Sequence, residues 1–131
     1  MIVPYTELPG GGGLPRPILD VSVAGLDDAT FPCLTDTGSI NSLLPVWIAE
    51  EAGLALGELE ARPLGVGGMA TEARFVPVRL TAVGHSWEAE VGFTDPWPYD
   101  WGLLGQLSFF RYFVVTFRAA DFQLEVVPVG S

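Results

Sequence analysis

The residues best suited to chemistry in this chain are Asp36, Thr37, Gly38 and Ser39, a polar turn that follows the apolar stretch 31–35. A free aspartate has a pKa of about 3.9 and is a poor base at neutral pH unless its surroundings perturb it. Two carboxylates held about 3 Å apart share one proton, so one ionises early and the other late. Such a pair can polarise a water molecule and protonate an oxygen together, which would hydrolyse a peptide bond without a metal or a covalent intermediate.

The remaining composition removes most other kinds of chemistry. All six basic residues among the 131 are arginine, which excludes a Schiff-base, P-loop or kinase lysine. One histidine and one cysteine cannot assemble a His/Cys metal site, a zinc finger or an internal disulfide. The net charge of −10 makes nucleic acid a poor partner, because its phosphates are repelled. We therefore expect no metal and no cofactor.

Length and patterning predict one small domain built mainly from strands. A hydrophobic content of 49% supports a buried core, and 16 glycines with 11 prolines favour many turns and short strands. A helix is expected to begin at Pro45 and to continue over 46–52, with Gly53 just past its end. A second short helix fits within 102–112. Strands are expected over 18–23, 31–35, 62–66, 73–83, 87–93, 113–117 and 122–127. The expected fold class is all-β with one or two short helices.

The cysteine and the apolar segments indicate a compartment. Cys33 stands between Pro32 and Leu34 in an apolar run, so we expect a buried core thiol that is not reactive. Residues 1–5 lack the basic region and the continuous apolar run of a signal peptide. No stretch reaches the roughly 18 apolar residues of a membrane-spanning helix. These features favour a cytoplasmic protein without a membrane partner.

The Asp36–Ser39 turn resembles the signature of aspartic proteases, and three other segments stand in the order of the retroviral-type enzymes. Arg16-Pro17, before an alternating strand, resembles the start of that domain. The segment 65–69, Gly-Val-Gly-Gly-Met, is similar to its glycine-rich flap tip. Leu103-Leu104-Gly105 resembles its second apolar-apolar-glycine signature. The resemblance spans residues 16–127 and implies a retropepsin-like domain of residues 16–131, preceded by an arm or linker of residues 1–15. It also implies a small closed barrel-like acid-protease fold with a β-hairpin flap.

The number of Asp-Thr-Gly motifs bears on the oligomeric state. Pepsin-type enzymes carry two such motifs in one long chain, whereas this chain carries one, at Asp36. The other aspartates lack the following Thr/Ser-Gly: Asp20, Asp27, Asp28, Asp95, Asp100 and Asp121. The resemblance therefore implies a homodimer in which a two-fold axis brings the two copies of Asp36 together. It implies an aspartic endopeptidase whose substrate is a peptide or protein.

The resemblance also assigns roles within the turn. Asp36 would be the catalytic carboxylate, Thr37 would bridge the two turns of the dimer, and Gly38 would let the substrate backbone approach closely. The Ser39 hydroxyl would donate to the ionised carboxylate, which favours the charged form and a lower working pH.

Substrate binding is expected between the flap and an apolar wall. Val66 would present its backbone N–H to a bound peptide, and Gly67 and Gly68 would supply bend and mobility. Gly65, in the same flap segment, is expected among the substrate-binding residues. Trp101, Leu103 and Leu104 would line pockets for bulky apolar side chains.

Some positions depart from the family. Gln106 stands where the family usually has arginine, and Ile40 stands where retroviral members place the aspartate that pairs with it. Both members of that ion pair are absent, so the chain does not bury one charge without its partner. Arg16 loses its expected acidic partner as well. We therefore expect dimerisation through other contacts, such as a sheet of Val3–Leu8 with Gln123–Val127.

Three functional hypotheses follow. The first is a homodimeric aspartic endopeptidase, on the turn and the flap. The second is a catalytically degenerate dimerisation or peptide-binding module that keeps the fold, on the missing ion pair. The third is a monomeric precursor that awaits removal of residues 1–15. His85 is expected to be a solvated turn residue, and the aromatic loop at 97–101 either packs over a sheet end or lines a pocket.

Overall fold

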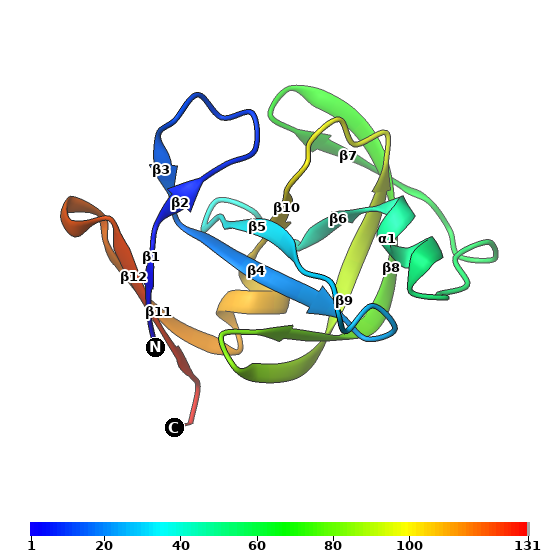
Figure 1. Ribbon diagram of the computed structural model, residues 1–131. Coiled ribbons are helices and arrows are strands. Elements are labelled where there is room, and N and C mark those ends of the chain that lie inside the picture. The colour runs from blue at the N-terminus through cyan, green and yellow to red at the C-terminus, as the bar shows by residue number, and fades with distance from the viewer. Residues whose placement is uncertain (131) are drawn as a thin grey trace.

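The computed structural model describes residues 1–130 (Figure 1). Strands hold 51% of the residues and helices 11%, which confirms the all-β class. The strands are β1 (Ile2–Pro4), β2 (Thr6–Glu7), β3 (Pro15–Arg16), β4 (Ile18–Val23), β5 (Phe31–Thr35), β6 (Leu43–Pro45), β7 (Arg62–Val66), β8 (Met69–Ala82), β9 (His85–Asp95), β10 (Gly102–Leu104), β11 (Phe113–Arg118) and β12 (Gln123–Pro128). The helices are α1 (Val46–Glu51), the π-helical η1 (Gln106–Phe110) and the 3₁₀ turn η2 (Ala119–Asp121).

Six strands close into a barrel, as the fold prediction required. Their order is β4-β5-β10-β6-β9-β8, and β8 pairs back onto β4 at Ser22↔Thr81 and Val23↔Leu80. Strand β7 adds to the outside of β8 as a hairpin. Closure satisfies the hydrogen-bonding edges that an open sheet of these strands would expose.

Two barrel strands were not predicted from the sequence. β6 and β10 are three residues long and buried throughout, so they show no apolar–polar alternation. They insert as parallel partners, β10 beside β5 and β6 beside β9. The predicted helix after Pro45 is present over Val46–Glu51, but Pro45 caps it in an extended conformation and is not its first helical residue.

The core has two parts. The larger fills the barrel, and its fully buried members include Leu19, Leu80, Val91, Phe93 and Phe109. A smaller cluster of Leu43, Ala73 and Leu103 lies beside it and is joined by partly buried side chains: Leu34, Leu64, Val66, Phe75, Trp97 and Trp101. This second cluster packs between β7, β10 and the loop before β10, where the candidate site lies.

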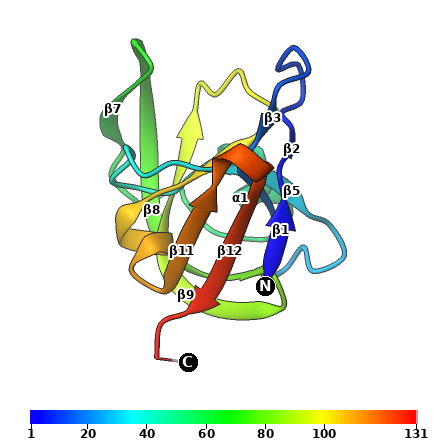
Figure 2. The same ribbon diagram turned by 90° about the vertical axis from the view of Figure 1, so that its left-hand side faces the viewer.

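The two ends of the chain form a separate three-stranded sheet in the order β1-β12-β11 (Figure 2). Ile2–Pro4 pairs antiparallel with Gln123–Glu125, within one chain. The expected pairing of Val3–Leu8 with Gln123–Val127 between two chains is wrong in this respect, because β12 already has a strand on each side. The rest of the arm folds back as the β2–β3 hairpin, whose glycine-rich loop spans 8–14.

Cys33 is a core thiol, as predicted. Its side chain is 0% exposed, and its Sγ donates weakly to the Phe31 carbonyl at 3.5 Å. Burial raises the pKa of the Cys33 thiol well above its ordinary range, because desolvation disfavours the thiolate; the Gly102 backbone N–H opposes this effect and the Asp20 carboxylate adds to it.

This burial predicts an alkaline limit to stability. An unfolded thiol ionises above about pH 8.5, whereas the folded one stays protonated. The stabilisation is therefore complete below that pH and is lost above it, by up to about 1.4 kcal/mol per pH unit. Denaturant unfolding at about pH 8 and pH 10 should show a steeper loss for the unchanged protein than for Cys33→Ala. Equal losses in the two proteins, or rapid alkylation of the folded thiol by iodoacetamide, would contradict this assignment.

Within residues 1–130, no helix combines the length and the apolar content needed to span a bilayer.

Candidate active site

Asp36 is the first residue after β5, and the barrel fixes its backbone. Its N–H donates to the Leu104 carbonyl at 2.9 Å, which anchors it to the end of β10. The preceding Thr35 is buried, and both its N–H and its hydroxyl donate to the Pro17 carbonyl, at 3.0 and 2.8 Å. The carboxylate therefore begins from a rigid strand end and not from a free loop.

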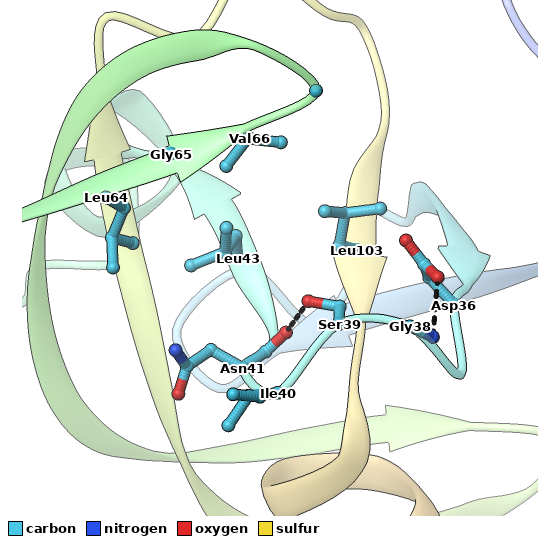
Figure 3. A pocket seen from close by; sticks show the side chains of 11 residues that line it. Asp36, Gly38, Ser39, Ile40, Asn41, Leu43, Leu64, Gly65, Val66 and Leu103 are labelled. Carbon is cyan, nitrogen blue, oxygen red and sulfur yellow. Dashed lines mark hydrogen bonds between the residues drawn. The ribbon is translucent and has the colours of Figure 1, made fainter.

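The turn itself orients the carboxylate. The Gly38 N–H donates to Asp36 Oδ1 at 2.9 Å, and the Ser39 N–H donates to the Asp36 carbonyl at 3.1 Å (Figure 3). A Cβ on Gly38 would lie 3.2 Å from Oδ1, tighter than most such contacts, so glycine suits this close approach. The result is a partly buried aspartate with one oxygen held and the other directed to the cavity side of the turn.

The role expected for the Ser39 hydroxyl is not what the structure shows. Its Oγ donates to the Asn41 carbonyl at 2.7 Å, away from the Asp36 carboxylate (Figure 3). The hydroxyl thus stabilises the backbone of its own turn. Its predicted effect on the ionisation of Asp36, and with it the argument for a lower working pH, does not hold in this structure.

Helix η1 holds the turn in place through hydrogen bonds to its backbone carbonyls. The N–H groups of Gln106 and Leu107 donate to the carbonyls of Ser39 and Ile40, at 2.9 and 3.0 Å. Gln106 Nε2 also donates to the Thr37 carbonyl at 2.8 Å. A neutral amide therefore makes a direct bond to the turn at the position where an arginine is usual in the resembled family. Neither Gln106 nor Ile40, which is 66% exposed, carries a charge, so no buried charge is left without a partner.

A buried hydroxyl network supports these hydrogen bonds, and the sequence patterns did not reveal it. Ser42 Oγ accepts from the Gly105 N–H at 3.0 Å, and Ser108 Oγ accepts from the Ser42 N–H at 3.0 Å. The Ser108 carbonyl in turn accepts from Trp87 Nε1 at 2.8 Å. Satisfied buried networks of this kind hold one backbone arrangement against alternatives.

Gly105→Ala should distort the turn. A Cβ at Gly105 would collide with the Asn41 carbonyl and lie 2.7 Å from the Ser39 carbonyl oxygen, both of them backbone atoms. We expect the variant to lose about 2–3 kcal/mol of unfolding free energy, as overpacking against backbone usually costs. Denaturant titration measures this loss. Gly57→Ala, at a position with no neighbour within 4 Å, is the control and should stay within about 0.5 kcal/mol. Equal stability of the two variants would show that the turn yields easily.

A cavity of about 320 Å³ opens between the turn and the β7–β8 hairpin (Figure 3). It is lined by Asp36, Gly38, Ser39, Ile40, Asn41, Leu43, Leu64, Gly65, Val66, Gly67 and Leu103. Leu43 and Leu103 form an apolar floor, and Val66 projects toward them from the hairpin. Asp36 is the one carboxylate in this lining.

The structure brings together most of the predicted site residues. Those that line the cavity are Asp36, Gly38, Ser39, Gly65, Val66, Gly67 and Leu103. Four others lie outside the lining: Thr37, Gly68, Trp101 and Leu104. Thr37 is exposed on the turn, and Gly68 completes the tip of the hairpin. Leu104 is 1% exposed within the barrel core, because it alternates with Leu103 along β10 and points inward. Trp101 lines a different cavity.

The cavity is also lined by residues that the sequence analysis did not propose as site residues: Ile40, Asn41, Leu43 and Leu64. A period-two reading of β7 would have found Leu64, which stands two residues before Val66 and therefore shares its face. Leu43 gave no such signal because β6 is buried on both faces.

Within residues 1–130, no three His, Cys, Asp or Glu side chains gather closely enough to hold a metal ion. Neither the protein-family models nor the curated proteins compared with this chain gave a match.

Proposed function

We propose that this protein is a homodimeric aspartic endopeptidase in which each chain supplies one Asp36. The observation that supports it best is the placement of a single, backbone-anchored carboxylate in an apolar-floored cavity beneath a glycine-tipped hairpin. One carboxylate cannot act as base and acid at once. A second copy of the chain, related by a two-fold axis, would supply the missing group.

The proposed reaction uses the two copies of Asp36 as a pair that shares one proton. The ionised copy takes a proton from a bound water as the water oxygen attacks the peptide carbonyl carbon. The protonated copy gives its proton to the carbonyl oxygen, which forms a neutral gem-diol. The two copies have now exchanged roles. Collapse of the gem-diol breaks the C–N bond: one hydroxyl gives its proton to the copy that is now ionised, and the leaving nitrogen receives a proton from the copy that took one from water. No metal or covalent intermediate enters this sequence.

The β7–β8 hairpin would serve as the flap. Its two-residue turn places Gly67 at φ +55° and Gly68 at φ +81°, the left-handed conformations that a tight hairpin turn needs. β7 is the last strand of its sheet, so its outer edge can hydrogen-bond an extended peptide. Val66 and Leu64 would then contact apolar side chains of that peptide from above.

Dimer formation would use the outer edge of β11. The N–H and C=O of Val126 both bond to Met1, on the β1 side. The backbone N–H and C=O groups of successive residues in a strand point to opposite sides, so those of the next residue, Val127, point toward β11, where Val127 pairs with Val114. The same alternation directs the N–H and C=O of Phe117 to the free edge of β11, which within residues 1–130 pairs with no other strand.

The opposite edge of this sheet is less suited to pairing. Strand β1 ends in Pro4, which has no N–H. Met1 bonds to Val126 of β12, and Tyr5 bonds to Phe122, the residue before β12. The alternation between them turns Pro4 outward, and proline on an outer edge discourages pairing. We therefore assign the partner to β11, where two copies would join as a continuous six-stranded sheet.

Exposed apolar side chains connect this edge to the Asp36 turn. Ile40, Leu107 and Phe117 are 66%, 49% and 38% exposed. The Leu107 N–H binds the Ile40 carbonyl, and the Phe110 ring of the same helix lies 6.4 Å from the Phe117 ring. An apolar path of this kind suits burial against a second copy and would place that copy beside the turn.

The alternative is a peptide-binding or dimerisation module of the same fold that does not hydrolyse. The bond from Gln106 to Thr37 favours it, because Thr37 is already engaged by its own chain. Hydrolysis of a bulky apolar peptide between about pH 4 and 6, blocked by a statine-type transition-state mimic, would exclude this alternative. Binding of the mimic without any hydrolysis would instead favour the module. We place the protein in the cytoplasm, where a reduced, buried thiol is ordinary.

A further inference from the structure

A second cavity, of about 390 Å³, lies between the N-terminal arm and the aromatic loop 96–101. Figure 1 shows the two segments that enclose it, the blue loop between β2 and β3 and the yellow loop before β10. Its lining is Leu8, Pro9, Gly10, Gly11, Pro98, Tyr99, Asp100 and Trp101. Trp101 also packs against the Leu43–Leu103 cluster, which floors the Asp36 cavity. The two cavities therefore flank one apolar wall and share no lining residue.

The aromatic rings of this cavity are held in place. Tyr99 stacks on Trp101 with ring centroids 4.6 Å apart and planes 26° from parallel. Trp97 meets both rings edge-on, at 5.2 and 6.2 Å, and its Nε1 donates to the Trp101 carbonyl at 2.8 Å. Rings fixed before binding lose little entropy on contact with a ligand. Their faces carry the negative potential that attracts cations.

The charge of the cavity has one sign. Asp100 is exposed and contributes the one carboxylate of the lining, and no arginine is among the lining residues. The opposite wall is the backbone of Gly10 and Gly11, which have no side chains to fill the space. The net charge of −10 raises the local concentration of cationic ligands further.

We propose that this cavity binds an arginine side chain of a peptide ligand. The guanidinium plane would stack on the aromatic pair of Tyr99 and Trp101 and form an ion pair with Asp100. A planar, weakly hydrated cation fits such stacking better than the ammonium of lysine does. The prolines and glycines would contact the aliphatic stem.

Combined with the proposed protease function, on which this step rests, the cavity gives a substrate preference. Trp101 precedes Leu104 by three residues, and strands rise about 3.3 Å per residue, so the cavity lies roughly 10 Å from the end of β10 that anchors Asp36. An extended peptide covers that distance in about three residues. The preferred substrate would thus carry an arginine about three residues from the bond that is cleaved.

Binding is tested separately from catalysis by using the Asp36→Asn protein. The probe is the blocked peptide acetyl-Ala-Arg-Ala-amide, and its matched control replaces arginine by citrulline, which has nearly the same shape without the charge. Chemical shifts of the tryptophan indole N–H groups report the binding site. We expect saturable shifts of Trp97 and Trp101, with the citrulline peptide binding roughly tenfold more weakly.

Variants then assign the contacts. Trp101→Leu should weaken binding of the arginine peptide roughly tenfold, whereas Trp47→Leu, at an exposed tryptophan on α1, should leave it unchanged. Asp100→Asn, at an exposed position that does not endanger folding, should weaken binding severalfold and reduce its salt dependence. Equal binding of the arginine and citrulline peptides, tighter binding of a proline-only peptide, or shifts at Trp47 instead of Trp101 would overturn the proposal. Failure to hydrolyse any peptide would contradict the protease function but not this site.

Discussion

Asp36→Asn is expected to abolish peptide hydrolysis while the protein stays folded and dimeric. An amide can neither take a proton from water nor give one to the peptide oxygen, and in a homodimer one substitution removes both members of the pair. We expect the rate to fall by at least about 10³-fold, in the range that general acid–base groups contribute. The fold should persist because the asparagine Oδ1 can still accept the Gly38 N–H that Asp36 Oδ1 accepts now.

The measurement is the initial rate of cleavage of a fluorogenic peptide at saturating substrate, with unfolding followed in parallel. Asp27→Asn is the matched control, since it makes the same change in charge at an exposed turn outside the cavity lining. It should keep full activity. Undiminished hydrolysis by Asp36→Asn would contradict the assignment of this residue.

Phe117→Pro is expected to convert the dimer to a monomer and to remove activity with it. Proline deletes the N–H that points to the free edge of β11 but leaves the hydrogen bonds of the β11–β12 ladder, which Val114 and Thr116 carry. The β11 strand of the second copy would lose a backbone hydrogen bond and would meet the pyrrolidine ring at the interface. Because the site needs two chains, activity should fall at least about 10²-fold at low micromolar protein.

Phe117→Ala is the matched control, since it removes the same aromatic ring and keeps the N–H. It should remain dimeric at high concentration and dissociate on dilution at a higher concentration than the unchanged protein does. Sedimentation velocity over a dilution series measures both effects. If the Phe117→Pro protein stays dimeric, the dimer interface does not lie at the edge of β11.

The sequence predicted the parts of this fold that repeat a local pattern. β4, β5 and β7 lie where the sequence predicted strands, and the break at Gly67–Gly68 is the hairpin turn. In β4 the buried residues Leu19, Val21 and Val23 alternate with Asp20 and Ser22, so the period of a strand can be read from the sequence. The all-β class followed from segments of this kind, whereas the closed barrel was implied by the resemblance to retroviral-type proteases.

Other features depend on contacts between distant segments. β6 and β10 are too short and too uniformly buried to show a period, yet they complete the barrel and hold Asp36 through the Leu104 carbonyl. The orientation of the Ser39 hydroxyl was equally hidden, because a serine beside an aspartate can bond either the carboxylate or its own turn. Only the backbone path of the turn decides between them.

The arm illustrates a different limit. Residues 1–15 were expected as an arm or linker, with Val3–Leu8 in a sheet with Gln123–Val127 at the dimer contact. The pairing of Ile2–Pro4 with Gln123–Glu125 forms such a sheet within one chain. A pattern of apolar residues indicates that a strand has a partner but does not say in which chain that partner lies. The edge left open by this pairing is what directs the proposed dimer to β11.

The separation of the two Asp36 carboxylates in a crystal structure of the dimer tests the central claim most directly. The account predicts nearest oxygens about 3 Å apart across a two-fold axis, close enough for the pair to share one proton. Carboxylates more than about 6 Å apart in the dimer, or a crystal in which β11 pairs and the two turns face away from each other, would leave the proposed hydrolysis without its acid and base.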